Sequence, residues 1–408
     1  MAARPLACLL AALALALVAA GCGGSDDDSD STTKKGAAGV QQAGDESSDL
    51  QDWPLFGRIK TRTHYLRGKN LDPPFKEDWA IQQGVLIEYP PALNDGVLYL
   101  ADKAGTVTAY RASTGDKIWK KEGGGSANGA PDDTTGPTYF HGRVFVAMQH
   151  GEVFALEPET GKEDWRRRLP TQLESSPLVI RTTVYLGTDK GDLYALDTRN
   201  GKVRWTYHAS SQPVKTSPSY AAGRVYFADY GGTIHAVDAK TGKQVWSTPT
   251  DGKLGSGGFY SSPMLVAGKL YIGRDDGGFF ALDQGSGKVL WSTDTGKPII
   301  GSPAAAKTNG TPLTVYIGNY AGTLYAFKAA GGGQRWKVNV GGAIPGTPTV
   351  VGNTVYTSSF HTQEATGYDT KSGDKVFHFA APGYTPMISD GQHVFLVGYE
   401  SLRALEPK

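Results

Sequence analysis

A unit of four short strands recurs along this chain, and its period constrains the fold more than any other feature. The stretch from Ser176 to Trp205 reads SPLVIRTTVYLGTDKGDLYALDTRNGKVRW. Alternating β-branched and aromatic residues, interrupted by turns that contain glycine, predict short antiparallel strands. Four such strands fit in this unit.

Two independent markers repeat with the unit. A closing aromatic residue returns every 40 to 46 positions, at Trp79, Trp119, Trp165, Trp205, Trp246, Trp291, Trp336 and Phe377. An apolar–aromatic pair in the second strand also occurs eight times, at Leu98-Tyr99, Val144-Phe145, Val184-Tyr185, Val225-Tyr226, Leu270-Tyr271, Val315-Tyr316, Val355-Tyr356 and Val394-Phe395. Four strands in each period of this length predict an all-β chain folded as an eight-bladed β-propeller of four-stranded antiparallel blades.

The phase of the two series predicts how the ring closes. Trp79 precedes the first apolar–aromatic pair, and no closing aromatic follows the last pair, Val394-Phe395. The chain therefore begins with an outer strand, at residues 75–79, and ends with three inner strands. Joining them in the last blade would remove the open sheet edges.

Residues 1–22 have the features of a lipoprotein signal peptide. Arg4 supplies the positive charge, and the apolar run of Leu6 to Ala20 is about 15 residues long, which is short for a spanning helix of roughly 20. The run ends in Ala-Ala-Gly-Cys, which resembles the bacterial lipobox, and this implies lipid attachment at Cys22. The alternative is an ordinary signal peptide that leaves Cys22 as a free thiol.

Residues 23–52 predict a disordered acidic tether. They are rich in Gly, Ser and Asp and carry eight acidic residues against two lysines. A segment with so few large apolar groups cannot bury enough surface to fold. We expect it to hold the propeller, residues 53–408, away from the extracytoplasmic side of a bacterial membrane in the cell envelope.

Charge and cysteine content exclude several kinds of site in residues 53–408. Their net charge is +6, and the basic residues are scattered, so no nucleic-acid surface is indicated. Both cysteines, Cys8 and Cys22, precede this region, which excludes a disulfide or a cysteine-based site in it. The histidines show no metal-ligand spacing. We therefore assign no catalytic, cofactor-binding or metal-binding residue.

The repeated residues themselves are interpreted as structural. Glycine in the turn between the third and fourth strands supplies a positive φ angle. The closing aromatics, from Trp79 to Phe377, are expected to wedge between neighbouring blades with their rings buried.

The motif from Val184 to Trp205, repeated from Val225 to Trp246, resembles the repeat of quinoprotein-type propellers. The arm Trp53-Pro54-Leu55-Phe56-Gly57 is similar to the N-terminal arm of quinoprotein alcohol dehydrogenases. The resemblance covers residues 53–408. It implies either a dehydrogenase that uses pyrroloquinoline quinone (PQQ), or a non-enzymatic lipoprotein like that of the outer-membrane β-barrel assembly machinery.

The second interpretation is favoured, because the dehydrogenases of this fold carry adjacent cysteines and long insertions that this chain lacks. We expect a monomeric, membrane-anchored scaffold without a cofactor that binds a protein partner in the envelope. A small-ligand-binding or sensory propeller and a quinone-dependent enzyme remain as alternatives.

One face of the propeller is expected to bind the partner. The loops between the second and third strands and those between blades share this face, which includes the long glycine-rich loops 120–136 and 247–261. Loops on a rigid scaffold are where binding residues usually lie. The candidate contact residues are Asp229, Tyr230, Tyr260, Arg274, Asp275, Asp276, Asn319 and Tyr320.

Overall fold

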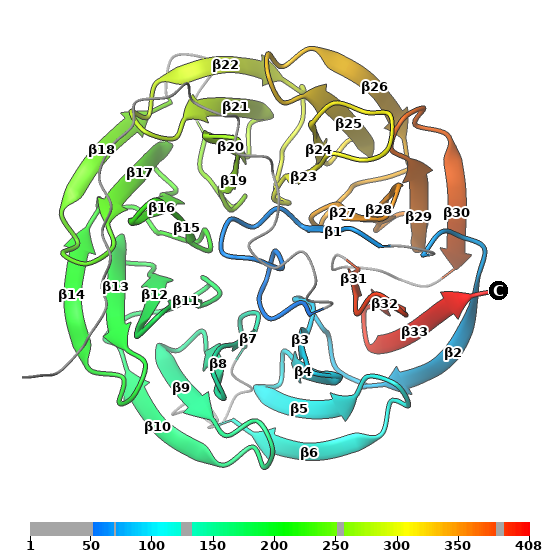
Figure 1. Ribbon diagram of the computed structural model, residues 1–408. Helices are drawn as coiled ribbons and strands as arrows, with labels where there is room; N and C mark the ends of the chain where they lie inside the picture. Colours follow the sequence, from blue (N-terminus) through cyan, green and yellow to red (C-terminus); the bar gives the residue numbers. More distant parts are fainter. Residues whose placement is uncertain (1–51, 69–70, 124–132, 251–256, 381–386) are drawn as a thin grey trace, which may run out of the picture. The chain divides into compact units, whose positions relative to one another are not determined.

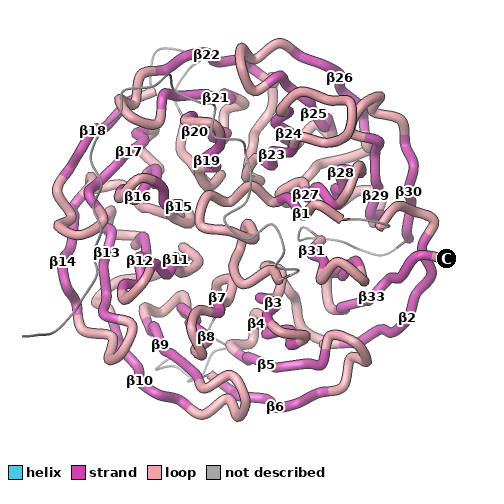
Figure 2. The backbone as a smooth tube through the Cα atoms, viewed as in Figure 1, coloured by secondary structure: helices cyan, strands magenta, loops and turns pink. Residues whose placement is uncertain are grey.

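The computed structural model describes residues 52–68, 71–123, 133–250, 257–380 and 387–408. These residues form eight antiparallel blades arranged in a ring around a central axis (Figure 1), which confirms the predicted fold. The described residues contain strands, turns and loops only (Figure 2). Among them, no helix is long and apolar enough to span a membrane.

The first four blades follow one another along the chain, each running from an inner strand beside the axis to an outer strand at the rim. Blade 1 comprises β3 (Ala92–Asn94), β4 (Val97–Ala101), β5 (Thr106–Arg111) and β6 (Lys117–Glu122). Blade 2 comprises β7 (Thr138–Tyr139), β8 (Val144–Ala147), β9 (Glu152–Leu156) and β10 (Glu163–Arg168). Blade 3 comprises β11 (Leu178–Ile180), β12 (Thr183–Gly187), β13 (Asp192–Asp197) and β14 (Val203–His208). Blade 4 comprises β15 (Ser219–Ala221), β16 (Arg224–Ala228), β17 (Thr233–Asp238) and β18 (Gln244–Pro249).

The next three blades repeat this order, and the eighth is composite. Blade 5 comprises β19 (Met264–Val266), β20 (Lys269–Gly273), β21 (Gly278–Asp283) and β22 (Val289–Asp294). Blade 6 comprises β23 (Ala304–Ala306), β24 (Thr314–Gly318), β25 (Thr323–Lys328) and β26 (Gln334–Asn339). Blade 7 comprises β27 (Thr349–Val351), β28 (Thr354–Ser359), β29 (Glu364–Asp369) and β30 (Lys375–Ala380), with β1 (Tyr65–Leu66) added parallel to β27. Blade 8 comprises β31 (Ile388–Ser389), β32 (Val394–Val397), β33 (Ser401–Pro407) and β2 (Phe75–Gln82).

Blade 8 closes the ring as the sequence predicts. The N-terminal strand β2 pairs antiparallel with the C-terminal strand β33, from Phe75 opposite Pro407 to Gln82 opposite Ser401. The strand is longer than the predicted segment 75–79. This pairing occupies the edge of β33 that would otherwise be open to another chain.

The closing aromatics lie at the joints between blades. Trp205 at the end of blade 3 lies against the turn of blade 4, where a Cβ added to Gly242 would be 2.6 Å from the ring. The indole N–H of Trp165 similarly donates to the carbonyl of Thr198 in the next blade, at 2.8 Å. Seven Trp–Gly contacts of this kind occur: Trp79–Gly115, Trp119–Gly161, Trp165–Gly201, Trp205–Gly242, Trp246–Gly287, Trp291–Gly332 and Trp336–Gly373.

Phe377 replaces tryptophan at the joint between blades 7 and 8, which is built differently from the others. The third and fourth strands of blade 8, β33 and β2, come from opposite ends of the chain, so no short turn with a glycine connects them. The side chain of Phe75 packs against Phe377 instead, with ring centroids 5.5 Å apart at 75°. The one exception in the aromatic series therefore coincides with the closing blade.

A series of hydroxyl groups near the axis also joins the blades. The residue before the inner-strand proline donates its backbone N–H to the hydroxyl of the corresponding residue one blade further on. The five bonds run from Gly136 to Ser176, Ser176 to Ser217, Ser217 to Ser262, Ser262 to Ser302 and Ser302 to Thr347, at 2.8–3.0 Å. These bonds satisfy N–H groups that the inner strands would otherwise leave buried without partners.

Candidate functional site

The topology separates two faces of the ring. The turn face carries the connections between the first and second strands and between the third and fourth strands of each blade. The loop face carries the connections between the second and third strands and those from one blade to the next. Of the predicted loops 120–136 and 247–261, residues 124–132 and 251–256 lie outside the described residues. Residues 120–122 and 247–249 belong to the outer strands β6 and β18, so the predicted loops began too early.

The N-terminal arm, residues 53–66, lies across the centre of the ring (Figure 1). Its backbone carbonyls accept hydrogen bonds from the inner strands of successive blades. Lys60 accepts from Tyr220 in blade 4, Thr61 from Leu265 in blade 5 and Thr63 from Ala305 in blade 6, at 2.8–2.9 Å. The arm therefore binds several blades at once at the axis.

Two basic side chains of the arm are completely buried. Arg62 donates from Nε to the carbonyl of Pro218 at 2.6 Å and from Nη1 to the carbonyl of Phe56. Burial lowers the pKa of Arg62 to about 9. Burial, together with the nearby charge of Arg62, lowers the pKa of His64 to about 3, so the imidazole is neutral at physiological pH.

Three buried side chains of the arm leave no open space beside them for a bound cofactor. PQQ is a planar tricarboxylate and needs an open slot lined by cations. Trp53, Arg62 and His64 lie at the axis with no exposed surface, so the arm leaves no slot beside them. Within the described residues, no group of three or more His, Cys, Asp or Glu side chains could hold a metal ion.

The loop face instead presents a compact aromatic cluster, formed by Tyr230, Tyr260, Lys215 and Asp275. The Tyr230 and Tyr260 rings meet edge to face, with centroids 5.1 Å apart. A hydrogen bond to Asp275, and a weaker one to Tyr260, hold the pKa of Tyr230 above its ordinary value. Gly258 lies against the Tyr230 ring, where an added Cβ would clash at 2.2 Å.

Lys215 completes the aromatic cluster. Its ammonium group lies 5.2 Å from the centre of the Tyr260 ring and 5.9 Å from that of Tyr230, within cation–π range. It also forms an ion pair with Glu174 at 2.8 Å. Burial would lower the pKa of Lys215, but the bond to Glu174 raises it, so the group remains charged.

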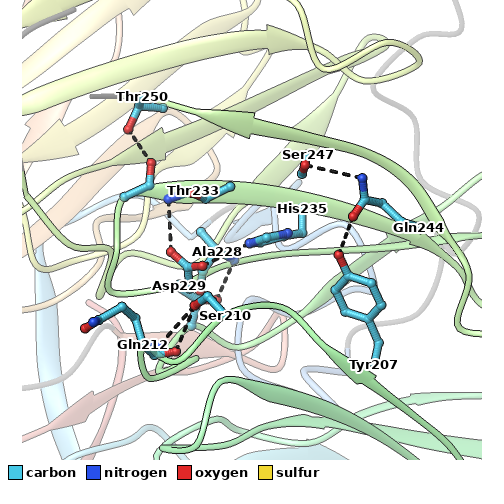
Figure 3. Close-up of polar contacts among 12 residues, drawn as sticks. Tyr207, Ser210, Gln212, Ala228, Asp229, Thr233, His235, Gln244, Ser247 and Thr250 are labelled. Atoms are coloured by element: carbon cyan, nitrogen blue, oxygen red, sulfur yellow. Dashed lines mark hydrogen bonds and ion pairs between the residues drawn. The ribbon is translucent and has the colours of Figure 1, made fainter. Parts of the chain in front are cut away.

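Asp229, predicted as a contact residue, is buried and only 1% exposed. Its two oxygens accept from the backbone N–H of Thr233 at 3.0 Å and from Nε2 of His235 at 3.1 Å (Figure 3). Burial would raise the pKa of Asp229, but these bonds hold it below its ordinary value. The side chain therefore stabilises its own loop.

Arg274 and Asn319 are buried in the same way, so the expectation that the loops display Asp229, Arg274 and Asn319 was wrong. Arg274 donates to both oxygens of Asp276, at 3.0 and 2.7 Å, and to the hydroxyl of Thr250. The amide oxygen of Asn319 accepts from backbone N–H groups within its own loop, at 3.0 and 3.1 Å. The physical reason is shared, because the first side chain of each loop turns inward to satisfy polar groups there.

The remaining predicted residues lie near the surface. Tyr320 is 39% exposed, and Tyr230, Tyr260, Asp275 and Asp276 are half-buried. Asp275 also accepts from the backbone N–H of Gly258 at 2.8 Å, which ties the long loop of blade 5 to the short loop beside it. The structure thus brings Tyr230, Tyr260 and Asp275 together, as a cluster on the loop face.

Sequence reasoning missed Lys215 and Glu174, although the repeat marks their positions. Both stand two residues before a Ser-Pro pair, as Tyr260 does. The residues before the inner strands of successive blades lie side by side around the axis. The corresponding residues of other blades are Thr134, Ile300 and Pro345.

Comparison with known proteins gives a family for the chain. The family model described as outer membrane protein assembly factor BamB, a PQQ-type repeat, matches residues 69–213, 104–250 and 211–398. BamB of Salmonella typhimurium is 33% identical over 94 residues, which cover 22% of this chain and 24% of that protein. A quinohemoprotein alcohol dehydrogenase of Comamonas testosteroni is 27% identical over 147 residues, which cover 32% of this chain and 21% of the enzyme. These alignments span about a quarter of the relatives' lengths.

Solved structures agree with the fold. BamB from Moraxella catarrhalis has a TM-score of 0.68 at 18% identity, and the match covers 82% of this chain and all of that one. A quinohemoprotein alcohol dehydrogenase from Pseudomonas putida has a TM-score of 0.75 at 16% identity, over 88% of this chain and 81% of the enzyme. At these identities the structures support the propeller and not an activity. Because the matched repeats extend from residue 69 to residue 398, the chain belongs to the family of PQQ-type repeat propellers described as outer membrane protein assembly factor BamB.

Proposed function

We propose that this propeller is a non-enzymatic, protein-binding scaffold of the bacterial cell envelope, and that the aromatic cluster on its loop face is the docking point. Its relatives carry the name of assembly factors for outer-membrane proteins, which supports a role of the same class. The single observation that carries the proposal is the grouping of Tyr230, Tyr260, Lys215 and Asp275 on a rigid ring.

The chemistry of the cluster suits a protein partner. Tyrosine is enriched at the energetic centres of interfaces, because its ring buries a large area and its hydroxyl keeps a polar contact. The cluster joins connections from several blades that β-strands hold in place, so binding there would order few additional groups. Tyr320, 39% exposed, adds a further aromatic side chain to the same face.

We also propose that the scaffold is attached to the membrane through Cys22. The support is the lipobox-like end of the apolar run and the acidic segment that follows it, residues 23–52. Cys22 lies outside the described residues. An envelope location agrees with the relatives' name, which places their role in the assembly of outer-membrane proteins.

The quinohemoprotein relatives support a second candidate function, a PQQ-dependent dehydrogenase. The arm argues against it, since its buried side chains lie where a quinone would need open space. Purified protein incubated with PQQ, Ca²⁺ and an alcohol should give no dye reduction above background. Turnover with quinone bound in a one-to-one ratio would overturn the non-enzymatic assignment.

The docking proposal is tested by capturing the proteins of the β-barrel assembly machinery from membranes of the source organism. The double variant Tyr230→Ala, Tyr260→Ala should weaken capture by at least about 10-fold, since interface anchors contribute roughly 2 kcal/mol or more each. Thr160→Ala and Ser286→Ala, on the turn face, are the controls and should leave capture unchanged. If the double variant captured its partners normally and the controls did not, the partner would bind the turn face and the docking proposal would be wrong.

A further inference from the structure

The turn face carries a hollow at the joint between blades 2 and 3 that the proposed docking function does not use. Its volume is about 450 Å³, which falls within the usual range for small-ligand sites. Its lining combines the aromatic rings of Phe140, His141 and Phe145 with the guanidinium groups of Arg143, Arg181 and Arg199.

The three arginines reach this hollow from three different turns. Arg143 follows the turn between β7 and β8, Arg181 lies between β11 and β12, and Arg199 lies between β13 and β14. The first two turns belong to neighbouring blades. The ring geometry of the repeat therefore brings together side chains that are far apart in sequence.

Arg181 is not needed by the turn that carries it. Its φ angle is 53°, and the same turn position in blades 4 and 5 is held by Ala222 and Ala267, at 50° and 51°. An alanine is therefore sufficient to form this turn. Because the framework does not require the guanidinium group, its presence at the mouth of a hollow calls for another explanation.

The carboxylates that the structure describes around the hollow balance its arginines only in part. Arg143 is paired with Asp164 at 2.6 Å. Arg199 and Arg204 share a single carboxylate, Asp197, at 3.0 and 2.7 Å. The hydrogen bonds from Arg199, followed by those from Arg204, hold the pKa of Asp197 far below its ordinary value.

Arg181 has no hydrogen bond or ion pair from its side chain to any residue that the structure describes. Among the described residues, the four arginines Arg143, Arg181, Arg199 and Arg204 thus have two carboxylate partners, Asp164 and Asp197, which leaves an excess of two positive charges there. Guanidinium groups recognise carboxylates and phosphates through paired, charge-assisted hydrogen bonds.

The aromatic side chains that line the hollow indicate what kind of ligand it could bind. Phe145 is 1% exposed and lies behind the joint, 6.1 Å from the Trp165 ring, while Phe140 is half-buried at the hollow. A bare inorganic anion would leave this aromatic wall in contact with water. A ligand that carries a carboxylate on an aromatic or aliphatic body would satisfy both the wall and the cations.

We propose that the hollow between blades 2 and 3 is a binding site for a carboxylate joined to an apolar body. Arg181 supplies the main charge contact, and Phe140 supplies the apolar contact. Both a free organic acid and a glutamate beside an aromatic residue in a peptide have this chemistry. The site lies on the opposite face from the aromatic cluster and is independent of the docking proposal.

The test uses 3-phenylpropionate as probe and its neutral isostere, 3-phenylpropionamide, as matched control, with ligand-observed NMR on the full chain at low salt. A ligand of this size should bind with a Kd of about 1 mM. The amide should bind at least 10-fold more weakly, because it cannot form the charged pair. Equal binding of acid and amide, or no binding of the acid at 10 mM, would overturn the proposal.

Two variants locate the site. Arg181→Ala installs the residue that blades 4 and 5 carry at this position, so it should fold normally and weaken 3-phenylpropionate binding by about 10-fold. Arg111→Ala removes an equivalent exposed charge from the turn face of blade 1 and should leave binding unchanged. Unchanged affinity in Arg181→Ala, or displacement of the probe by equimolar inorganic phosphate, would overturn the assignment.

A capped dipeptide, acetyl-Glu-Phe-amide, distinguishes the two sources of the ligand. Binding at least 10-fold tighter than 3-phenylpropionate, and lost in Arg181→Ala, supports a peptide segment as the natural ligand. Binding of the acid alone supports a free organic acid. Either result supports the shared chemistry of the site.

Discussion

At the scale of single residues, the joints between blades depend on glycines that lie directly beneath indole rings. Gly242 has a φ angle of +71° and lies against Trp205, whereas Gly223, in the same blade and at +75°, has no neighbour within 4 Å of an added Cβ. Both positions require a positive φ angle, but only Gly242 contacts an indole ring. The pair therefore separates the two effects.

We predict that Gly223→Ala destabilises the fold by about 1 kcal/mol, the cost of placing an alanine at a positive φ. Gly242→Ala should cost about 3 kcal/mol, because the methyl group also displaces the Trp205 ring. Urea denaturation of the two variants measures the difference. Equal midpoints would show that the ring contact does not hold the joint.

Arg274 is the residue whose role the structure changes most. Its guanidinium group is buried, is bonded to Asp276 and Thr250, and lies 5.1 Å from the centre of the Phe280 ring. Removing Arg274 would leave the half-buried carboxylate of Asp276 without its partner. An exposed anchor would behave differently.

We therefore predict that Arg274→Ala destabilises the protein by about 3 kcal/mol. Tyr230→Ala, in the corresponding loop of blade 4, should cost less than about 1 kcal/mol. The melting temperatures of the two variants test whether Arg274 stabilises the fold more than Tyr230 does. A melting temperature of Arg274→Ala like that of the wild type would mean that the buried pair contributes nothing.

The repeat indicates which residues stand at equivalent positions, but it does not indicate which way a side chain turns. The variable polar residue that opens each loop reads as a surface residue, yet Asp229, Arg274 and Asn319 all turn inward. An Asp or Asn can bond its own backbone or face solvent, and only the closed loop decides between them. The sequence predicted Tyr230 and Tyr260 of the aromatic cluster correctly as surface residues, because a tyrosine side chain does not bond the backbone of its own loop as Asp and Asn do.

At the scale of elements, strand β2 carries the closure of the ring. Its pairing with β33 covers seven residue pairs, and Arg403 bonds Glu77 across it at 2.6 Å. The period and phase of the two repeated markers alone predicted this pairing. The series begins with an outer strand that has no blade of its own and ends with a blade that lacks its outer strand, so the two must pair.

A chain truncated to residues 84–408 should be strongly destabilised and prone to aggregate, since it leaves the edge of β33 unpaired. A chain truncated to residues 71–408 also lacks the arm but keeps β2, and it should be more stable than the shorter one. Solubility and thermal melting compare the two. Equal behaviour would assign the loss to the arm and refute the role of β2.

His393 links the inner part of blade 8 to the closing strand. Its Nδ1 lies 3.0 Å from Asp390, and its Nε2 lies 3.6 Å from Asp78 in β2. The hydrogen bond to Asp390 is the main cause that raises the pKa of His393 above 6.5; Asp78 and Glu406 act in the same direction. The charged imidazolium therefore stabilises the joint.

The sign of the pH dependence follows. The stability that charged His393 contributes is complete below pH 6.5 and is lost as pH rises through the higher folded pKa. Urea midpoints should therefore fall between pH 6 and pH 8, and His393→Gln should show a shallower fall. His141→Gln, on an exposed turn, is the control. Identical slopes in His393→Gln and the wild type would contradict the prediction.

At the scale of the whole molecule, the fold could be predicted almost completely and the binding surfaces only in part. Seven of the eight joints between blades are built alike, so the sequence carries the signal of the architecture many times. Each binding surface occurs once. The hollow of Phe140, Arg143 and Arg181 left no repeat signal, because it forms from turns of two adjacent blades.

Attachment to the membrane is a prediction for the whole chain. Cys22→Ala should leave the protein unprocessed or release it from the membrane, because the lipid would have no attachment site. Cell fractionation and gel migration measure both outcomes. A variant that sediments and migrates like the wild type would contradict lipid attachment at Cys22.

The pairing of β2 with β33 has a consequence for the order in which the chain can fold during synthesis. The two strands join positions more than 300 residues apart, as the Glu77–Arg403 bond shows. The partner of the first outer strand is therefore synthesised more than 300 residues after it. Domains tend to fold from the N-terminus as the chain emerges, but blade 8 of this ring cannot close until β33 has also been made.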